Sequence, residues 1–219
     1  MISVIIPTFD EAKNLPSLLA SLPGQSTAHQ IIVVDGGSSD ATLQIAADFK
    51  TQIVLSEKGR GQQLKVGAEL AQGDILFFLH ADCQIPAGGL DAIQNHLQKD
   101  PKCPGGNFSL QFDGETDFAA WLTRFYGWIR RCGLYYGDSG IFVRREVYTA
   151  LGGIRPLALM ENYDFTRRLE KFGKTCCIAD PSLITSSRKF EGRRSVAIVW
   201  GWLRIHALYY LGVAPEKLA

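Results

Sequence analysis

The sequence predicts an α/β fold, built as a single mostly parallel, Rossmann-like sheet flanked by helices. Two patterns carry this prediction. Over residues 1–79, short runs rich in β-branched residues alternate with segments whose apolar residues recur at helical spacing, which is the β-α-β order of a parallel sheet. Residues 75–79 form an unbroken apolar run, I-L-F-F-L. Such a run is typical of a strand buried on both faces in the middle of a sheet.

The first half of the chain is expected to alternate regularly between strands and helices. Strands are predicted at 3–6, 31–34, 53–55 and 75–79, because each is a short apolar run that ends near turn-forming or polar residues. A helix follows each of the first three, the third of them over 62–71. The apolar faces of the first two helices comprise Leu15, Leu18, Leu19 and Leu22, and Leu43, Ala46 and Ala47.

The second half is less regular. Helices are predicted at 90–97, 118–129, 160–172 and 196–211, and strands at 107–112, 141–144, 176–178 and 183–186. The last helix is rich in aromatic residues and precedes Pro215. Because no internal repeat and no long linker divides the chain, we expect one domain over residues 1–219.

Composition excludes some classes of protein. The 219 residues are 46% hydrophobic and carry a formal net charge of +1, so bulk electrostatics do not indicate a nucleic-acid partner. The five cysteines are odd in number and lack C-x-x-C spacing, which favours reduced thiols over disulfides or structural zinc. The N-terminus M-I-S-V-I-I-P-T lacks a signal-peptide pattern, and Arg204 and His206 interrupt the final apolar segment. We therefore expect a cytoplasmic protein.

Polar residues follow three of the predicted parallel strands. Thr8 lies after the first strand, Asp35 ends the second, and His80 and Asp82 follow the fourth. The carboxyl ends of parallel strands share one edge, where open α/β sheets bind ligands. Neither a G-x-G-x-x-G fingerprint nor a Walker A loop is present. A structural alternative stays open, because Asp35, Ser38 and Asp82 also suit helix capping.

Several segments of the chain, in order, resemble the successive blocks of family 2 glycosyltransferases. The first three are S-V-I-I-P-T-F-D-E-A-K-N-L, I-I-V-V-D-G-G-S-S-D-A-T and G-D-I-L-F-F-L-H-A-D. The resemblance also includes K-G-R-G-Q-Q-L-K-V-G-A, Y-G-D-S-G-I-F-V-R-R and the L-G-G-I before Met160, and it covers nearly the whole chain. The H-A-D triplet looks most similar to a small bacterial branch often placed beside radical-SAM or arsenosugar-type genes.

This resemblance implies the GT-A fold, with a nucleotide-binding half at about residues 1–100 and an acceptor and catalytic half at about 101–219. It implies a nucleoside-diphosphate sugar donor, UDP-linked, bound at the strand ends. Asp35 would accept a hydrogen bond from the uracil or ribose, and Lys58 and Arg60 would reach the base or diphosphate unless they form an ordinary solvated turn. The expected nucleotide-binding residues are Pro7, Thr8, Phe9, Glu11, Asp35, Gly36, Ser38, Lys58, Arg60, His80 and Asp82.

The resemblance also implies a divalent metal, Mg²⁺ or Mn²⁺, at Asp82. This residue would be the carboxylate of a degenerate D-x-D motif, and hard cations of this kind bridge one or two carboxylates to substrate phosphates. His80 replaces the first acidic residue of the motif. Because imidazole is a softer ligand, we expect His80 to hydrogen-bond the ribose or to fill space rather than bind the metal.

The implied reaction is transfer of the sugar, with inversion, to a hydroxyl acceptor. In the family the general base is usually the Asp of an E-D pair, but this chain has Glu161-Asn162-Tyr163-Asp164. We expect Glu161 to be the base, with Asp164 either an alternative base or the partner of Arg168, one helical turn on. An acidic first turn with an exposed ion pair is the structural alternative.

Two other functions fit parts of the sequence. Asn162 cannot accept a proton, so a nucleotide-sugar-binding scaffold without catalysis is one alternative. A sugar nucleotidyltransferase is the other, but it would require a glycine-rich basic loop after the first strand, where P-T-F-D-E stands.

The remaining expectations concern the acceptor side. Asp138 and Ser139 would lie near the donor sugar or the acceptor. Arg188 and Arg193 would close over the diphosphate or touch anionic lipid, unless they lie in a solvated loop. The aromatic residues Trp121, Tyr126 and Trp128 suit stacking on a sugar or lipid, or a core. The final helix permits peripheral contact with the inner face of a membrane, or packing in a homodimer. The sequence does not identify the acceptor.

Overall fold

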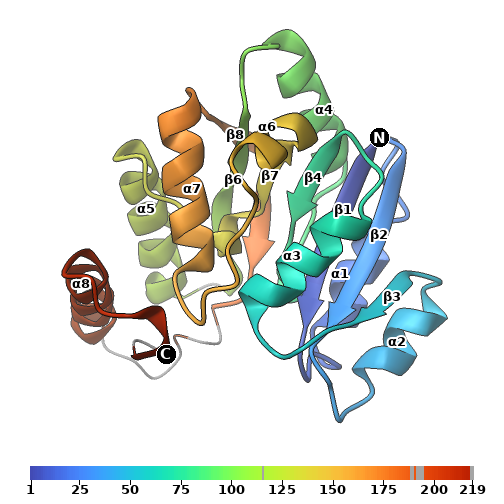
Figure 1. The fold of residues 1–219 in the computed structure, drawn as a ribbon, viewed down its shortest axis with the longest axis horizontal. Helices are drawn as coiled ribbons and strands as arrows, with labels where there is room; N and C mark the ends of the chain where they lie inside the picture. Colours follow the sequence, from blue (N-terminus) through green and yellow to red (C-terminus); the bar gives the residue numbers. More distant parts are fainter. Residues whose placement is uncertain (115, 188–189, 191–194, 218–219) are drawn as a thin grey trace.

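The computed structural model describes residues 1–114, 116–187, 190 and 195–217. These residues form eight strands and eight α-helices, which alternate from β1 to β4 and less regularly beyond it (Figure 1). The strands are β1 (Ile2–Thr8), β2 (His29–Asp35), β3 (Gln52–Leu55), β4 (Ile75–Phe78), β5 (Cys83–Gln84), β6 (Gly105–Phe112), β7 (Ile141–Arg144) and β8 (Cys176–Thr185). The α-helices are α1 (Leu15–Ser21), α2 (Thr42–Asp48), α3 (Arg60–Leu70), α4 (Gly89–Lys99), α5 (Asp117–Arg131), α6 (Arg145–Ala150), α7 (Glu161–Phe172) and α8 (Ser195–Tyr210). The short 3₁₀ helices are η1 (Gly137–Ser139) and η3 (Pro215–Lys217).

The eight strands form one sheet in the order β3-β2-β1-β4-β7-β6-β8-β5. The first four strands of this order are parallel to one another, as are β6 and β8. Strand β7 runs antiparallel to both of its neighbours, and the short β5 is antiparallel to β8. The sheet is therefore mostly parallel, as expected, and the carboxyl ends of β1, β2 and β4 meet at one edge.

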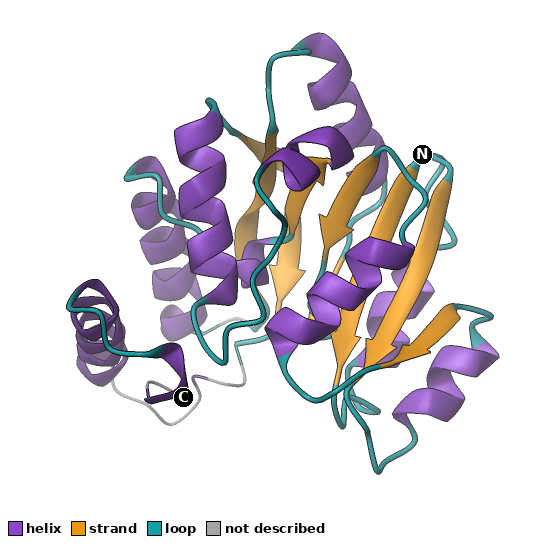
Figure 2. Ribbon diagram, viewed as in Figure 1, coloured by secondary structure: helices purple, strands orange, loops and turns teal. Residues whose placement is uncertain are grey.

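Helices cover both faces of the sheet (Figure 2). One buried cluster joins the sheet to α1, α2, α4 and α5, and a second joins it to α3, α6 and α7. Side chains alternate between the two along β1, where Val4 and Ile6 enter the first cluster and Ile5 the second. Gly67 lets α3 approach the sheet closely, since a Cβ there would lie 2.4 Å from Cγ2 of Ile5.

Most elements agree with the sequence prediction, and the differences lie after β4. The two short strands expected at 176–178 and 183–186 are one strand, β8, because both parts pair with β6 across a register shift. The expected alternation in β6 is present, with Phe108, Leu110 and Phe112 buried. The short elements β5 and α6 were not predicted, since they have too few residues to show a period.

Two expectations from composition can be compared with the structure. All five cysteines are free, as predicted. Within the described part of the chain, no helix combines the length and the hydropathy required to cross a bilayer. The last helix, α8, packs against α5 through the stacked rings of Trp202 and Phe125, whose centroids are 5.1 Å apart.

Candidate active site

A pocket of about 330 Å³ opens at the carboxyl ends of β1 and β4, beside the start of α3. We call it the strand-end pocket. It brings together all of the expected nucleotide-binding residues except Asp35, Gly36 and Ser38. Its lining is formed by Pro7, Thr8, Phe9, Glu11, Lys58, Gly59, Arg60, Gln63, His80, Ala81 and Asp82.

Asp35 lies below this pocket and is completely buried. Its Oδ2 accepts hydrogen bonds from the hydroxyls of Thr8 (2.9 Å) and Ser38 (2.5 Å), while its Oδ1 accepts from the N–H groups of Gly37 (2.9 Å) and Ser38 (2.7 Å). Asp35 therefore orders the turn after β2 rather than capping α2, which begins at Thr42. A nucleoside would reach this carboxylate only by displacing one of these partners.

Gln63 was not predicted as a site residue, yet it joins three elements beneath the pocket. Its Nε2 donates to the carbonyl oxygens of Thr8 (2.7 Å) and Val34 (2.8 Å), at the ends of β1 and β2. Gly36 donates its N–H to the same Thr8 carbonyl at 2.9 Å, and a Cβ on Gly36 would lie 3.2 Å from Nε2 of Gln63. The only signal in the sequence was its position in K-G-R-G-Q-Q-L-K.

The loops after β1 and β2 are tied together by hydrogen bonds. Asp10 donates its N–H to Oγ of Ser38 (2.9 Å), and its carboxylate accepts the N–H of Ser39 (2.8 Å). Ser38 therefore bridges Asp35 and Asp10 instead of lining the pocket. Nearby, the ammonium of Lys58 lies 3.7 Å from the centroid of the Phe9 ring, a cation–π contact at the mouth of the pocket.

Asp82 is half-buried and lines the strand-end pocket. Its carboxylate has only a weak contact with other described residues, 3.9 Å to the thiol of Cys83. Among the described residues, no group of three or more acidic, His or Cys side chains could hold a metal by itself. One open carboxylate beside a pocket nevertheless fits Mg²⁺ or Mn²⁺, because such ions take much of their coordination from substrate phosphates and water.

His80 turns toward the second half of the chain. Its Nδ1 lies 3.3 Å from Oδ1 of Asp138, and its Nε2 is buried without a hydrogen-bond partner among the described residues. Gly137 fits between His80 and Asn162, since a Cβ on it would lie 2.5 Å from Nε2 of His80 and 2.3 Å from Nδ2 of Asn162. The expectation that His80 is not a metal ligand stays a prediction.

Glu161 is the first residue of α7 and is 4% exposed. Its Oε1 accepts a hydrogen bond from Nδ2 of Asn162 (3.0 Å) and lies 3.4 Å from Nε of Arg60. Its Oε2 has no hydrogen-bond partner in the described residues. Asn162, which departs from the family pattern, therefore holds the neighbouring carboxylate in place and leaves one oxygen free to accept a proton.

A second cavity, of about 260 Å³, begins where the strand-end pocket ends. We call it the aromatic pocket. Arg60 lines both cavities. The lining of the aromatic pocket comprises Arg60, Tyr126, Tyr136, Gly137, Asp138, Leu159, Met160, Glu161, Asn162, Tyr163, Phe190, Trp202, Ile205 and His206. Of its aromatic members, Tyr126 and those of the final helix were singled out in the sequence. That these segments meet α7 in one cavity has no local signature.

Asp164 lies in an ion-pair network and lines neither cavity. Its Oδ2 accepts from Arg168 at 2.6 and 2.9 Å, and its Oδ1 accepts from Arg155 at 3.2 Å. Arg168 also donates to the carbonyl oxygens of Leu151 and Gly153. Of the two roles expected for Asp164, this geometry agrees with the partner of Arg168 and not with a base. The ion pair is also largely buried rather than exposed.

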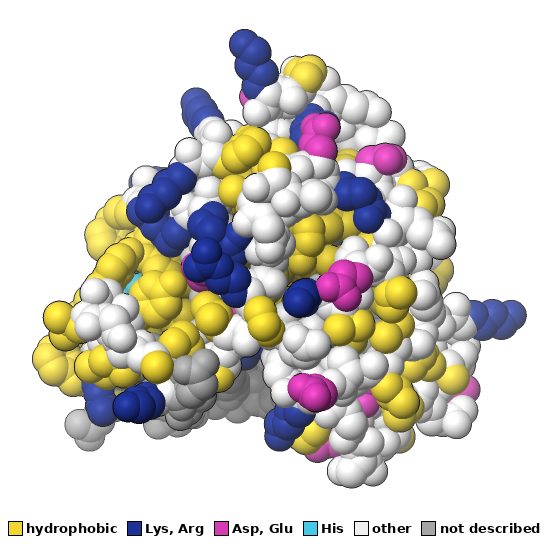
Figure 3. Space-filling view, in the orientation of Figure 1, with side chains coloured by type: hydrophobic (Ala, Val, Ile, Leu, Met, Phe, Trp, Pro, Cys, Tyr) yellow, Lys and Arg dark blue, Asp and Glu magenta, His cyan; other side chains and the backbone are white. Residues whose placement is uncertain are grey.

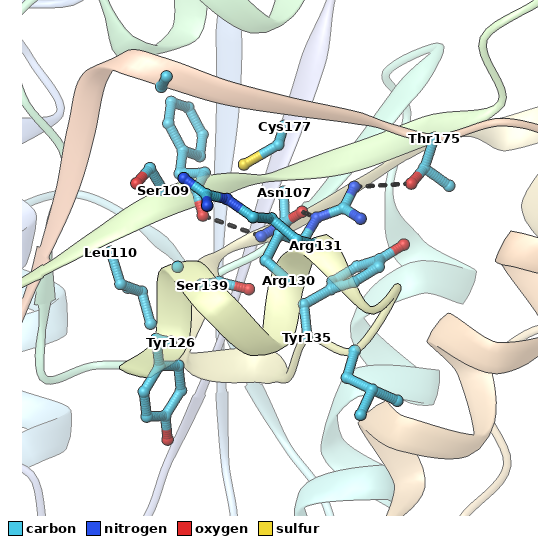
Figure 4. A pocket seen from close by; sticks show the side chains of 14 residues that line it. Asn107, Ser109, Leu110, Tyr126, Arg130, Arg131, Tyr135, Ser139, Thr175 and Cys177 are labelled. Atoms are coloured by element: carbon cyan, nitrogen blue, oxygen red, sulfur yellow. Dashed lines mark hydrogen bonds between the residues drawn. The ribbon is translucent and has the colours of Figure 1, made fainter. Parts of the chain in front are cut away.

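Asp138 and Ser139 occupy η1 but face different cavities. Asp138 lines the aromatic pocket, whereas Ser139 borders a separate cavity of about 510 Å³ beside α5, β6 and β8 (Figure 4). In that cavity the guanidinium of Arg130 donates hydrogen bonds to Asn107 (2.6 Å) and Thr175 (2.8 Å). These contacts link α5 to β6 and to the segment before β8. The expected diphosphate ligands Arg188 and Arg193 lie outside the described residues.

A mostly parallel sheet with helices on both faces and a polar pocket at its strand ends is the architecture of the GT-A fold. The chain belongs to glycosyl transferase family 2, whose sequence model matches residues 3–155.

Relatives agree with this assignment. Over 92 residues the chain is 35% identical to glycosyltransferase AglE of Haloferax volcanii, a match that covers 37% of this chain and 30% of that protein. The matches to the first curated relatives cover less than half of their length.

Solved structures share the fold. Glucosyl-3-phosphoglycerate synthase from Mycobacterium tuberculosis, in complex with Mn²⁺, UDP and glucosyl-3-phosphoglycerate, superposes with a TM-score of 0.68 at 19% identity, covering 98% of this chain and 80% of that one. The mannosyltransferase PcManGT from Pyrobaculum calidifontis, in complex with GDP-Man and Mn²⁺, has a TM-score of 0.66 at 20% identity, covering 93% and 60%.

Proposed function

We propose that this protein transfers a sugar, with inversion, from a UDP-linked donor in the strand-end pocket to a hydroxyl acceptor in the aromatic pocket. The observation that carries the proposal is the position of Glu161. Its carboxylate lies at the border of the two cavities, with one oxygen held by Asn162 and Arg60 and the other free. A base there can meet an acceptor that approaches a donor bound at the strand ends.

The chemistry is a single displacement. The acceptor oxygen attacks the anomeric carbon on the face opposite the diphosphate, the bond to the diphosphate breaks, and Oε2 of Glu161 takes the hydroxyl proton. Lys58 and Arg60 place positive charge beside the departing diphosphate. A bound Mg²⁺ or Mn²⁺, held by Asp82, would supply further neutralisation of the diphosphate. One displacement inverts the anomeric configuration.

Titration calorimetry with UDP, in buffer with Mn²⁺, with Mg²⁺ and with chelator, tests the donor site. We expect binding that depends on the metal. Absence of UDP binding under all three conditions would contradict the proposed donor. Tight binding of GDP instead would indicate a GDP-linked donor. An acceptor screen with each UDP-sugar, followed by NMR of the anomeric proton of the product, tests transfer and inversion.

The scaffold alternative makes a different forecast for the same samples, namely UDP-sugar binding without any transfer or donor hydrolysis. The free oxygen of Glu161 favours catalysis over this alternative. A nucleotidyltransferase would release pyrophosphate from UTP and a sugar phosphate, which a phosphate assay coupled to pyrophosphatase detects. Membership of the branch with an H-A-D triplet remains a prediction, and so does the expectation that residues 1–219 form one domain. A single cooperative transition in urea would support the latter.

Membrane association through α8 is part of the proposal. Side chains at 196, 200, 203, 207 and 210 are exposed and share one helical face, where Val196 is 80% and Trp200 69% exposed. Figure 3 shows hydrophobic side chains over this region with Lys and Arg at their margin. Apolar residues beside cations suit an anionic lipid surface. Co-flotation with phosphatidylglycerol vesicles that Trp200→Ser weakens is expected; a dimer by light scattering without flotation would favour self-association instead.

A further inference from the structure

We infer that the aromatic pocket selects the acceptor, and that the acceptor carries its hydroxyl on an apolar body of one or two rings or a short isoprenoid length. This inference rests on the proposed function and names the substrate class that the second cavity fits. The donor cavity has a different lining, with Glu11, Lys58 and Asp82 among its walls. The two cavities are therefore suited to a charged and an apolar ligand respectively.

The wall of the aromatic pocket formed by α7, α8 and the segment before η1 offers rings rather than hydrogen-bonding groups. The hydroxyl of Tyr136 lies 2.9 Å from Nε2 of His206, while Nδ1 of His206 lies 2.7 Å from the carbonyl oxygen of Trp202. The second contact requires a proton on Nδ1, so Nε2 accepts from Tyr136. The hydroxyl of Tyr163 is paired with that of Tyr210 at 2.5 Å.

The hydroxyl groups of Tyr136 and Tyr163 remain protonated and uncharged at neutral pH. Burial raises the pKa of Tyr136 to about 12, and burial, together with the neighbouring Tyr210, also raises the pKa of Tyr163. Because their polar atoms are already paired with one another, a sugar or another polyol bound against this wall would lose hydrogen bonds to water without replacing them. An apolar body loses no hydrogen bonds on binding there, and its transfer out of water is favourable.

At the other end of the pocket lie polar atoms that can form further hydrogen bonds. There the free Oε2 of Glu161 and the guanidinium of Arg60 border the donor cavity. Ile205 from α8 and Leu159, before α7, line the apolar part. The cavity is therefore amphipathic along its length, and an acceptor that fits it places its hydroxyl at Glu161 and its apolar body among the rings.

The size of the cavity suits a small apolar body. An apolar cavity of about 150 Å³ accepts benzene, and the aromatic pocket measures about 260 Å³. It therefore has room for more than one ring. Tyr136 and Tyr163 line the cavity with rings that stack on each other, their centroids 5.9 Å apart, and aromatic groups pack favourably beside such rings.

The binding test uses 2-naphthol and geraniol as probes, titrated into protein saturated with UDP and Mn²⁺. Methyl β-glucoside and 3-phosphoglycerate serve as polar comparators. We expect measurable binding of at least one apolar alcohol and binding of both comparators at least tenfold weaker. Naphthol ahead of geraniol would indicate an aromatic acceptor, and the reverse an isoprenoid one.

Two variants locate the binding site. Ile205→Ser and Leu159→Ser introduce polar groups on different sides of the cavity, and each is expected to weaken the preferred alcohol about tenfold while UDP affinity stays within twofold of wild type. Leu55→Ser, at an exposed position 69% accessible on β3, is the matched control. In transfer assays with the active UDP-sugar, the two cavity variants should show a higher KM for the acceptor, while the control variant should match the wild type.

The outcomes separate this inference from the proposed function. Intact UDP binding with transfer to methyl β-glucoside or 3-phosphoglycerate, and none to either apolar alcohol, would overturn the acceptor class while the glycosyltransferase function stood. Apolar alcohol binding that neither variant changes would also overturn it. Failure to bind UDP with or without metal would instead contradict the donor site.

Discussion

The guanidinium of Arg60 lies 3.4 Å from the carboxylate of Glu161, so the first residue of α3 meets the first residue of α7 where two cavities join. Close packing holds the two helices in this position. A Cβ on Gly61 would lie 2.8 Å from the carbonyl oxygen of Arg155, in the loop before α7. The relationship links the donor half of the sheet to the expected base, and the predictions below start from it.

Glu161→Gln should lower kcat by about 10²-fold or more, because an amide cannot take the acceptor proton. UDP affinity should change by less than twofold, since the substitution keeps the shape of the side chain. Glu69→Gln, at an exposed position on α3, is the matched control. Steady-state kinetics and calorimetry measure the two effects, and a fully active Glu161→Gln would remove Glu161 from the mechanism.

Asp82→Asn should weaken UDP binding at least tenfold in Mn²⁺ and leave the weaker binding in chelator unchanged. The reason is that a neutral amide is a poor ligand for a hard divalent cation. Calorimetry under both conditions measures the difference, with the exposed Asp48→Asn as the matched control. If the variant keeps the Mn²⁺ dependence of the wild type, the metal is held elsewhere.

Asn162→Asp should move the acid limb of the kcat/KM profile upward by about one pH unit. The amide now donates to Glu161 at 3.0 Å, and the variant replaces this donor with a second carboxylate. Like charges so close retain a proton to higher pH. Equal activity of the single variant and of Asn162→Asp combined with Glu161→Gln would show that the introduced carboxylate acts as the base instead.

Asp164→Ala should destabilise the protein by about 2–3 kcal/mol, because it leaves Arg168 without its carboxylate partner; full burial of the pair would raise the cost further. Arg168 is 18% exposed and Arg155 is 60% exposed in their side chains, which moderates the effect. Urea unfolding measures the loss against Asp48→Ala. Activity per folded molecule should stay within twofold, and a large loss of kcat at unchanged stability would indicate a catalytic carboxylate.

Stability should fall in acid partly through Asp91. Hydrogen bonds from Ser26 and Thr27 hold the pKa of Asp91 below its usual value of 3.8. A group with a lowered folded-state pKa stabilises the protein above its unfolded-state pKa, and this contribution disappears as the pH falls through the folded-state value. Urea midpoints at pH 6 and pH 3 should therefore differ less for Asp91→Asn than for the wild type. An unchanged difference would contradict the role of Asp91.

The strand ends were predictable from local sequence. The apolar runs of β1, β2 and β4 indicate buried parallel strands, and the polar residues after them lie at one edge because parallel strands point the same way. Pattern alone therefore brought Thr8, His80 and Asp82 toward one pocket. It did not show that the carboxylate oxygens of Asp35, at the same edge, accept hydrogen bonds from Thr8 and from the turn after β2.

By itself, then, the sequence determined the α/β class, the parallel strands at its centre and the edge where the strand-end pocket opens. Each of these depends on a short-range period or on the direction of neighbouring strands. Only the tertiary structure decided that Asn162 steadies Glu161, that Asp164 turns to Arg168, and that β7 runs against its neighbours. It also assembled the aromatic pocket from α5, α7 and α8. The pairing of β7 and the aromatic pocket join residues far apart in the chain, which local pattern does not specify. At the start of α7 the residues are close in sequence, and side-chain packing selected one arrangement among those that the pattern allowed.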